Sequence, residues 1–218
     1  FMRIYEVCDP FTMTSIERIY GLYRAVRYVV DQDIPGDIVE CGVWMGGSAM
    51  VAAMTLDMVG DTSRGLHLYD TFEGMTPPTD HDVNHEGAHA NDFLNPDDRV
   101  DGESNVWAYA SLENVRRNLD HSGVARDRFH LIKGKVEDTI PDQMPDAVSL
   151  LRLDTDWYES TAHELKHMYP TLSIGGVLII DDYGHWRGSR EATDEYFASN
   201  SGVLLNRLDY SGRIAVKR

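Results

Sequence analysis

Two groups of carboxylates follow apolar runs in the second half of the chain. Asp154 and Asp156 come directly after the run 147–153, and Asp181 and Asp182 come after the run 177–180. Continuous apolar runs are typical of buried parallel strands, which end at one edge of a sheet, where ligands bind. Carboxylates that converge there repel one another unless a cation neutralises them, and Mg²⁺ prefers oxygen ligands. The pattern predicts a Mg²⁺ site of Asp154, Asp181 and Asp182, with separate helix or turn caps as the alternative.

A glycine-rich turn lies in the first third of the chain. Glu40 follows the apolar pair Ile38–Val39, and Gly42, Gly46 and Gly47 precede a helix-forming run at 49–54. The spacing fits neither the dinucleotide motif G-x-G-x-x-G nor a Walker A loop. Strand, glycine turn and helix N-terminus together favour an anion-binding α/β unit. A ligand with a ribose and a zwitterionic tail, such as S-adenosylmethionine, fits this turn; a tight turn without a ligand is the alternative.

Further candidate cofactor positions follow the next strands. Asp70 ends the strand expected at 65–70, where a carboxylate can accept both ribose hydroxyls, although it could equally cap a loop. Val136 and Glu137 follow the strand expected at 129–132, where an adenine would rest or a helix would begin. The predicted cofactor-binding residues are Glu40, Gly42, Val43, Gly46, Ser48, Asp70, Thr71, Phe72, Val136, Glu137 and Asp154.

The elements that must position these residues alternate between strands and helices. A capping box at 14–17 starts a helix that continues to about residue 30, and further helices are expected at 106–119, 161–168 and 190–197. The runs 203–208 and 213–216, joined by a turn, predict an antiparallel hairpin at the end of the sheet. This predicts an α/β, class I methyltransferase-like domain over 1–218, with six parallel strands, one antiparallel strand and helices on both faces.

Residues 76–105 break the periodic pattern. They carry eight acidic residues and a single arginine. A loop of this length inside a compact domain is usually functional, and we expect a mobile lid over the substrate pocket. His81, His85 and His89 would share one face of a helix and could bind a metal, but no apolar periodicity supports a helix there.

Composition limits the classes of partner. The net charge of −16 disfavours nucleic acids and anionic membrane surfaces. No apolar run is long enough to span a bilayer, and the first residues do not have the pattern of a signal peptide. The two cysteines, Cys8 and Cys41, form neither a disulfide framework nor a metal-binding spacing. We expect a soluble, cytoplasmic protein.

Five segments resemble the macrocin O-methyltransferase family (TylF and MycF type). They are MTSIER at 13–18, VECGVWMGGS at 39–48, YDTFEGM at 69–75, LDTDWYEST at 153–161 and IDDYGHW at 180–186. The resemblance extends over nearly the whole chain, and the segment after Ile180 is specific to the family. It implies S-adenosylmethionine- and Mg²⁺-dependent methylation of a sugar hydroxyl on a glycosylated natural product, such as a macrolide or aminocoumarin antibiotic. It also implies a homodimer or a higher homo-oligomer.

The resemblance implies roles for individual residues. The metal ligands fall on Asp154, Asp181 and Asp182. Asp154 is the first candidate for the catalytic base and Asp156 the second, because a metal-bound hydroxyl still needs a group that takes its proton. The residues expected to line the acceptor side are Tyr158, His185, Trp186 and Arg187.

Three other functions use some of the same residues. A metal-dependent methyltransferase of catechol-like hydroxyls needs the same ligands, but such a site often adds a lysine base, and the chain has Trp157 at the position three after Asp154. A metal-dependent hydrolase would leave the glycine turn and Asp70 without a role and would usually use more histidine ligands. A non-catalytic nucleotide-binding module would leave the carboxylates unexplained.

Overall fold

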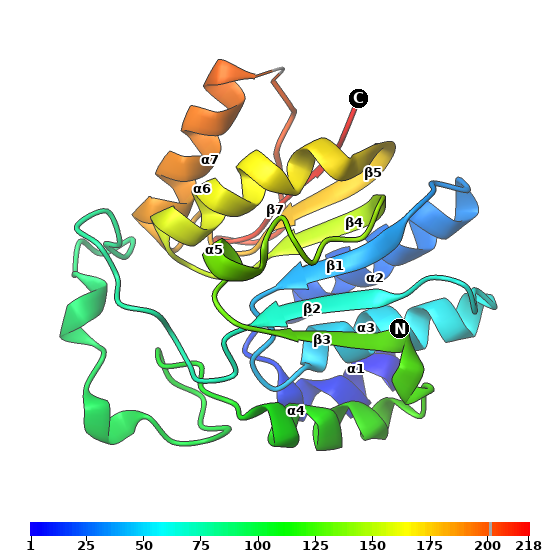
Figure 1. Cartoon of the computed structure of the whole chain (residues 1–218), viewed down its shortest axis with the longest axis horizontal. Helices are drawn as coiled ribbons and strands as arrows, with labels where there is room; N and C mark the ends of the chain where they lie inside the picture. Colours follow the sequence, from blue (N-terminus) through cyan, green and yellow to red (C-terminus); the bar gives the residue numbers. More distant parts are fainter. Residues whose placement is uncertain (201) are drawn as a thin grey trace.

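The computed structural model describes residues 1–200 and 202–218, and its centre is a seven-stranded sheet in the order β3-β2-β1-β4-β5-β7-β6 (Figure 1). Strand β7 pairs antiparallel with both β5 and β6, whereas β1 to β5 pair in parallel. This arrangement confirms the predicted fold class. The strands are β1 Asp37–Cys41, β2 Leu66–Asp70, β3 Phe129–Lys133, β4 Val148–Leu153, β5 Leu172–Ile180, β6 Asn206–Arg207 and β7 Arg213–Val216.

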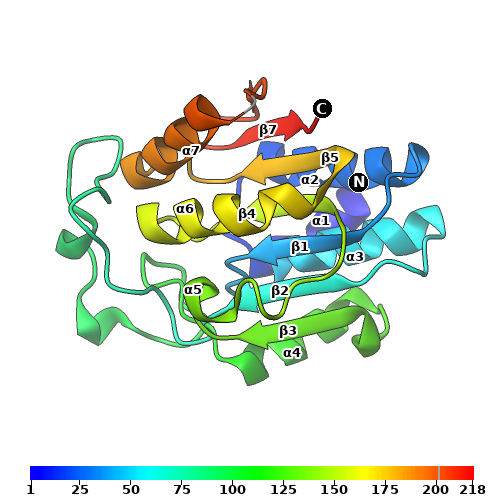
Figure 2. The ribbon, with the colours of Figure 1, turned by 45° about the horizontal axis from the view of Figure 1, so that its top comes forward.

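Helices cover both faces of the sheet (Figures 1 and 2). One face packs against α1 Met2–Cys8, α2 Ile16–Asp31, α3 Gly47–Val59 and α4 Leu112–Leu119. The other packs against α5 Val136–Thr139, α6 Tyr158–His167 and α7 Arg187–Ser199. Successive strand residues alternate between the two cores, so Ile38 packs toward α2 and α3 while Val39 packs toward α5 and α6. Short 3₁₀ turns lie at Asp9–Phe11, Ala90–Asp92, Pro96–Asp98, Asp120–Ser122, Arg126–Arg128 and Tyr169–Thr171.

The glycine turn after β1 depends on one close backbone approach. Gly42 has φ +83°, and a Cβ atom there would lie 2.0 Å from the carbonyl oxygen of Asp154. Any larger residue would therefore push apart the ends of β1 and β4. Gly46, at φ +90°, then starts α3. The turn and the loop after β4 thus form one packed unit.

The structure corrects two local predictions and adds one helix that was not predicted. The helix expected at 106–119 begins only at Leu112, because Ser111 accepts a hydrogen bond from the backbone N–H of Asn114 and caps it there. The strand expected at 203–208 is reduced to Asn206–Arg207. No pattern in the sequence indicated α1, a seven-residue helix that buries Ile4 and Cys8.

Residues 76–105, called the lid loop below, lie beyond the carboxyl ends of the parallel strands (Figures 1 and 2). Ala90 of the lid loop packs with Trp157 and Trp186, and Leu94 joins the same small cluster. His81, His85 and His89 share no helix, which removes the basis for a histidine metal site. Whether the lid loop moves stays a prediction.

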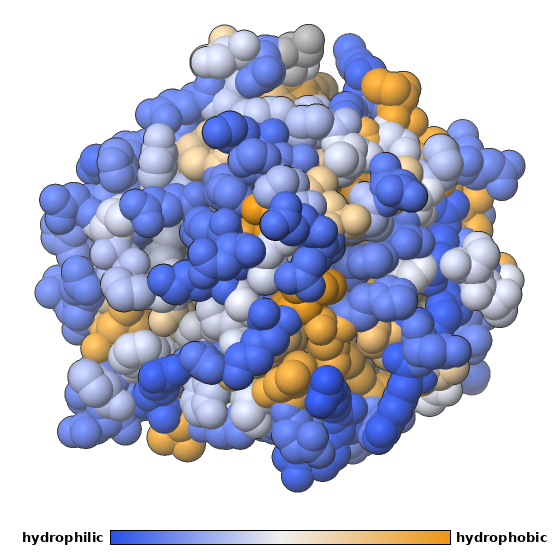
Figure 3. All heavy atoms as spheres, viewed as in Figure 1, coloured by the Kyte–Doolittle hydropathy of each residue, from blue (hydrophilic) through white to orange (hydrophobic). Residues whose placement is uncertain are grey.

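The surface of the face seen in Figure 3 is mainly hydrophilic, with a patch of hydrophobic residues near its lower centre. No helix in the part of the chain that the structure describes is long and apolar enough to cross a membrane. Cys8 and Cys41 are both buried free thiols.

Candidate functional site

A cavity of about 450 Å³ opens at the carboxyl ends of the strands. Its walls come from the glycine turn, the loops after β2 to β5, the segment before α2 and the turn between β6 and β7. Its size and position suit a small-molecule site at this edge of an α/β sheet. Of the predicted site residues, those that line it are Gly42, Val43, Ser48, Asp70, Thr71, Val136, Glu137, Asp154, Asp156, Asp181, Asp182, His185 and Trp186.

Glu40 does not line this cavity, contrary to its predicted place beside the cofactor. The side chain shares a face of the sheet with Ile38 and lies 3 % exposed beneath α3. Its Oε1 atom is 2.6 Å from Nη1 of Arg152. Glu40 therefore acts here as a buried partner of an arginine. Gly46 and Phe72 are also absent from the cavity wall.

The carboxylate of Asp70 shapes the glycine turn. Its Oδ2 atom accepts hydrogen bonds from the backbone N–H groups of Val43 at 2.7 Å and Trp44 at 3.2 Å. Its Oδ1 atom accepts one from the N–H of Phe72 at 2.6 Å. Three backbone donors thus hold the carboxylate that was expected to bind ribose hydroxyls, so much of its hydrogen-bonding capacity is already used by the protein.

Three carboxylates converge beside the cavity, and they differ from the predicted set by one residue. One oxygen each of Asp154, Asp156 and Asp182 lies within 4.8 Å of the others. The side chain of Asp182 is nearly buried, and no hydrogen-bond partner among residues 1–200 and 202–218 reaches its Oδ2 atom. A buried carboxylate oxygen without a donor, next to two further carboxylates, fits a hard divalent cation such as Mg²⁺.

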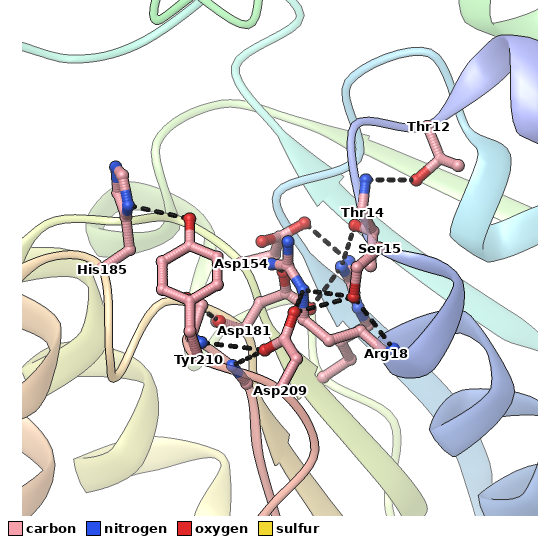
Figure 4. Close-up of polar contacts among 12 residues, drawn as sticks. Thr12, Thr14, Ser15, Arg18, Asp154, Asp181, His185, Asp209 and Tyr210 are labelled. Carbon is pink, nitrogen blue, oxygen red and sulfur yellow. Dashed lines mark hydrogen bonds and ion pairs between the residues drawn. The ribbon is translucent and has the colours of Figure 1, made fainter.

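Asp181 is instead bound by two arginines (Figure 4). Its Oδ1 atom is 2.7 Å from Nη2 of Arg152, and its Oδ2 atom contacts Nη1 of Arg18. Adjacent residues at a strand end point in opposite directions, so Asp182 faces the carboxylate cluster and Asp181 faces α2. For Asp181 to bind an ion as the resemblance implies, its carboxylate must leave Arg18.

Arg152 is the central counter-charge. The guanidinium lies 3 % exposed on β4 and contacts Glu40, Asp154 at 2.7 Å, and Asp181. Arg18 adds a second positive charge and also contacts Asp209 at 3.0 Å, in the turn between β6 and β7. The two arginines join the ends of β1, β4 and β5 to α2 and to the last hairpin. Buried charges persist only when paired in this way.

The charge balance raises the proton affinity of the cluster. Burial, reinforced by the charges of Asp154 and Asp181, raises the pKa of Asp156 to about 7, against a contact with Asp182 and the charge of Arg18, which lower it. Burial and the neighbouring carboxylates also raise the pKa of Asp182. A carboxyl with a pKa near 7 can accept a proton and release it at neutral pH.

The loop that carries Asp154 and Asp156 is held from behind. The hydroxyl of Thr155 donates to the carboxyl of Glu164, which is fully buried in α6, at 3.0 Å. Asp156 itself has φ +67°, a left-handed conformation that is uncommon outside glycine. Strained residues of this kind concentrate at functional sites.

Only two of the residues predicted for the acceptor side line the cavity. His185 and Trp186 line the cavity, and the hydroxyl of Tyr210 lies 3.0 Å from Nδ1 of His185 (Figure 4). Tyr158 and Arg187 lie outside the cavity, where the hydroxyl of Tyr158 donates to Glu195 and Nε of Arg187 contacts Glu191. That these two residues contact the acceptor stays a prediction.

Sequence reasoning missed several residues of the site. Arg152 could have been noticed, because a charged residue inside an apolar strand needs buried partners. Arg18 lies just after the capping box, and nothing local distinguishes it from a solvated helix residue. Tyr210 lies in a turn whose composition indicates only a hairpin. The remaining wall residues that were not predicted include Thr12, Met13, Thr14 and Ser211.

Comparisons with known proteins find relatives that match most of the chain. The sequence model of the family described as Macrocin-O-methyltransferase (TylF) matches residues 8–212. The chain is 37 % identical over 185 residues to the 8-demethyl-8-(2,3-dimethoxy-alpha-L-rhamnosyl)-tetracenomycin-C 4'-O-methyltransferase of Streptomyces olivaceus, which covers 85 % of this chain and 67 % of the relative. It is 34 % identical over 190 residues to the demethyldecarbamoylnovobiocin O-methyltransferase of Streptomyces niveus, covering 87 % of this chain and 69 % of the relative.

Solved structures show the same fold. The structure of the O-methyltransferase NovP superimposes with a TM-score of 0.82 at 29 % identity, over 95 % of this chain and 82 % of that one. The O-methyltransferase from Bacillus cereus in complex with SAH gives a TM-score of 0.59 at 13 % identity, over 99 % of this chain and 90 % of that one, and so supports the fold alone.

Proposed function

Because the chain belongs to the macrocin O-methyltransferase family, it is an O-methyltransferase, and we propose that it transfers the methyl group of S-adenosylmethionine to a sugar hydroxyl of a glycosylated natural product. The observation that carries this proposal is the convergence of Asp154, Asp156 and Asp182 beside a cavity that also contains the glycine turn. The proposed S-adenosylmethionine site and the proposed metal site then share one cavity. The acceptor class is inferred from the relatives, which are named for methylation of glycosylated antibiotics.

The cavity offers a separate support for each part of the donor. Val136 and Glu137, at the start of α5, would lie beside the adenine. Ser48 and the first turn of α3 would bind the carboxylate of the methionine part, since the first N–H groups of a helix have no partners within it. Asp70 would act mainly through the turn that it holds together.

We propose that Asp154 and Asp182 bind Mg²⁺ and that Asp156 is the catalytic base. Burial and the charges of Asp181 and Asp182 raise the pKa of Asp154 against the charge of Arg152, so proton affinity alone does not separate it from Asp156. Its ion pair with Arg152, at 2.7 Å, instead holds the carboxylate in a fixed position that suits a ligand. Asp156 contacts no arginine among the described ion pairs and has a pKa near 7. A third ligand could be Asp156, which lies beside the other two carboxylates, or Asp181, which the family resemblance implies. Metal-binding measurements on variants distinguish the two.

The reaction needs a weak acid to become a nucleophile. Mg²⁺, when bound, lowers the pKa of the acceptor hydroxyl and orients its oxygen. Asp156 takes the proton of that hydroxyl, while Arg152 and Arg18 keep the remaining carboxylates in place. Trp186 and the pair of His185 and Tyr210 form the wall against which the sugar rests. Burial lowers the pKa of His185, so its imidazole is neutral at neutral pH.

The test combines metal binding, cofactor binding and turnover. Mn²⁺ binding by electron paramagnetic resonance and S-adenosylmethionine binding by calorimetry would be measured on the wild type and on Asp154→Asn, Asp156→Asn, Asp181→Asn and Asp182→Asn. We expect Asp154→Asn and Asp182→Asn to lose Mn²⁺, and Asp156→Asn to keep it but lose turnover of a deoxysugar glycoside. Loss of Mn²⁺ in Asp156→Asn would make Asp156 a ligand, and loss in Asp181→Asn would return that role to Asp181. A wild type that does not bind S-adenosylmethionine would refute the proposed function.

We also propose that the chain forms a homo-oligomer. Large apolar side chains are exposed along the first two helices and the segment between them, namely Met2, Met13, Ile16, Tyr20 and Tyr28. Burying them in an interface would remove apolar area from water. Light scattering coupled to size-exclusion chromatography would decide, and a monomer at micromolar concentration would contradict the proposal.

A further inference from the structure

Asp82 is a fully buried carboxylate within an otherwise polar and largely exposed lid loop. Its relative exposure is 0 %, although most residues from 79 to 89 are exposed or partly exposed. No ion pair of Asp82 exists among residues 1–200 and 202–218, so its charge is balanced by hydrogen-bond donors rather than by a cation. A charge buried without a counter-ion is costly and needs every available donor.

The donors come from two separate parts of the molecule. Within the lid loop, the backbone N–H and the hydroxyl of Thr79 donate to Oδ2 at 2.7 and 3.0 Å. Outside it, the backbone N–H of Tyr158 donates to Oδ1 at 2.8 Å. Tyr158 is the first residue of α6 and follows Asp156 by two positions. Asp82 thus ties the lid loop directly to the end of the loop that carries two of the converging carboxylates.

The other side of the same carboxylate faces α7. A Cβ atom at Gly188 would lie 2.1 Å from Oδ1 of Asp82 and 2.9 Å from the backbone nitrogen of Tyr158. Gly188 has no positive φ, so its lack of a side chain is required by this contact and not by its backbone conformation. The carboxylate therefore fits between the N-terminal ends of α6 and α7, where two helix dipoles favour a negative charge.

Neighbouring lid residues reinforce the link to α7. The carbonyl oxygen of Val83 accepts a hydrogen bond from the N–H of Arg187 at 2.8 Å, and Asn84 pairs with Trp186 through an isolated antiparallel bridge. Figure 2 shows the lid loop beside the first turns of α6 and α7. The loop from Asp182 to Trp186, which precedes α7, is thereby attached to the same segment of the lid.

We propose that Asp82 is a positioning residue that holds the lid loop and the two carboxylate-bearing loops in one arrangement. On the proposed function, a sugar bound beneath the lid would then be set in register with Asp156 and Asp182. The ring of His85, in the same segment of the lid, lies 5.0 Å from that of His185 on the acceptor side of the cavity. Asp82 touches neither acceptor nor donor and acts through the backbone of Tyr158.

The experiment compares Asp82→Ala, Asp82→Asn and Gly188→Ala with Asp80→Ala, a control that removes an exposed aspartate two positions away. Hydrogen–deuterium exchange would be followed in the segments 76–90 and 154–160. Loss of one or two hydrogen bonds to a charged group is expected to speed exchange about tenfold or more in both segments of Asp82→Ala. Asp82→Asn, which keeps one acceptor for the N–H of Tyr158, should protect 154–160 better than 76–90.

Gly188→Ala tests the same contact from the opposite side. Its Cβ should displace the Asp82 carboxylate and reproduce the faster exchange of Asp82→Ala, and in the double variant it should add little to Asp82→Ala in the segment 76–90. Because this Cβ would also lie 2.9 Å from the backbone nitrogen of Tyr158, a further loss of protection is expected in 154–160. Calorimetry should give an affinity for S-adenosylmethionine within about threefold of wild type for each variant, since none lines the donor part of the cavity. With a glycoside acceptor, KM should rise and kcat fall, with partial recovery in Asp82→Asn.

Three results would overturn the proposal: Asp82→Ala that behaves like Asp80→Ala, faster exchange confined to 76–90 in Asp82→Ala, or additive effects of Gly188→Ala and Asp82→Ala on the segment 76–90. If no glycoside is methylated by any form while exchange changes as expected, the acceptor proposal fails and the role of Asp82 in the structure stands. The exchange data thus separate the two conclusions.

Discussion

Replacing Asp156 by asparagine should make the metal-free protein more stable. It should also lower the turnover of the enzyme. The substitution keeps the size and shape of the side chain. It also suits the backbone, because asparagine is among the residues that best tolerate the left-handed conformation that Asp156 adopts at φ +67°. The variant therefore removes a negative charge from the carboxylate cluster while leaving its packing unchanged.

The expected size of the gain follows from the pKa of Asp156. An unfolded chain has an aspartate pKa of about 3.9, and burial raises the pKa of Asp156 to about 7 in the folded chain. A raised pKa favours the folded state fully below about pH 4, and this contribution is lost as the pH rises through about 7. Asparagine does not titrate, so the variant should gain on the wild type over this range.

Without any screening by water, the raised pKa would let the variant gain about 3 kcal/mol of unfolding free energy on the wild type between pH 5 and pH 8. Partial access of water to Asp156 reduces the expected gain to about 1–2 kcal/mol. Urea unfolding in EDTA, followed by tryptophan fluorescence at pH 5, 6.5 and 8, measures it. Asp33→Asn is the matched control, because Asp33 also has a positive φ, of 50°, but lies in an exposed turn after α2. Turnover of the Asp156 variant should fall by about 10²–10⁴-fold, the usual contribution of a general base. A stability gain that is the same at pH 5 and pH 8 would refute the reasoning.

Four further substitutions, at three positions, test the buried contacts. Glu40→Gln should lower the free energy of unfolding by about 1–3 kcal/mol, because Arg152 loses a buried charged partner, while calorimetry finds S-adenosylmethionine affinity nearly unchanged; a large loss of affinity would restore Glu40 to the cofactor site. Asp70→Asn should weaken S-adenosylmethionine about tenfold by loosening the glycine turn, and an unchanged affinity would show that the turn keeps its shape without the carboxylate. Burial raises the pKa of Glu164, so Glu164→Gln should cost less than about 1 kcal/mol and Glu164→Ala about 2–3 kcal/mol in urea unfolding. Equal costs would mean that the carboxyl of Glu164 is ionised.

The parallel strands and the carboxylates at their ends could be predicted, because long apolar runs in the sequence are followed directly by acidic residues. Runs such as 147–153 and 177–180 locate the sheet, and the carboxylates after them fall at its functional edge. The start of a helix was harder to predict where a single capping residue sets it, as Ser111 does for α4. The hydrophobic pattern continues through that cap, so a pattern alone extends the helix too far.

Side-chain direction explains most of what the site predictions missed. Glu40 shares its face with Ile38, and strand alternation alone could have placed it under α3, away from the cavity. Asp181 and Asp182 are neighbours in sequence, yet only Asp182 lies with the other carboxylates. Arg18 reaches Asp181 from a position 163 residues earlier in the chain. A contact of that sequence separation leaves no local signal.

The contacts around Arg18 also have a consequence for biosynthesis. Ser15, beside Arg18, donates a hydrogen bond to Asp209, which lies 194 residues later. At roughly 5–20 residues per second, a ribosome takes about 10–40 s to make the chain between them. During that interval a nascent chain can pair its inner strands, but the part of the cavity wall formed by Tyr210 and Ser211 and the partner of Arg18 in the last hairpin do not yet exist. The segments around Ser15 and Asp209 thus close the cavity together, as a late event that follows translation of the hairpin.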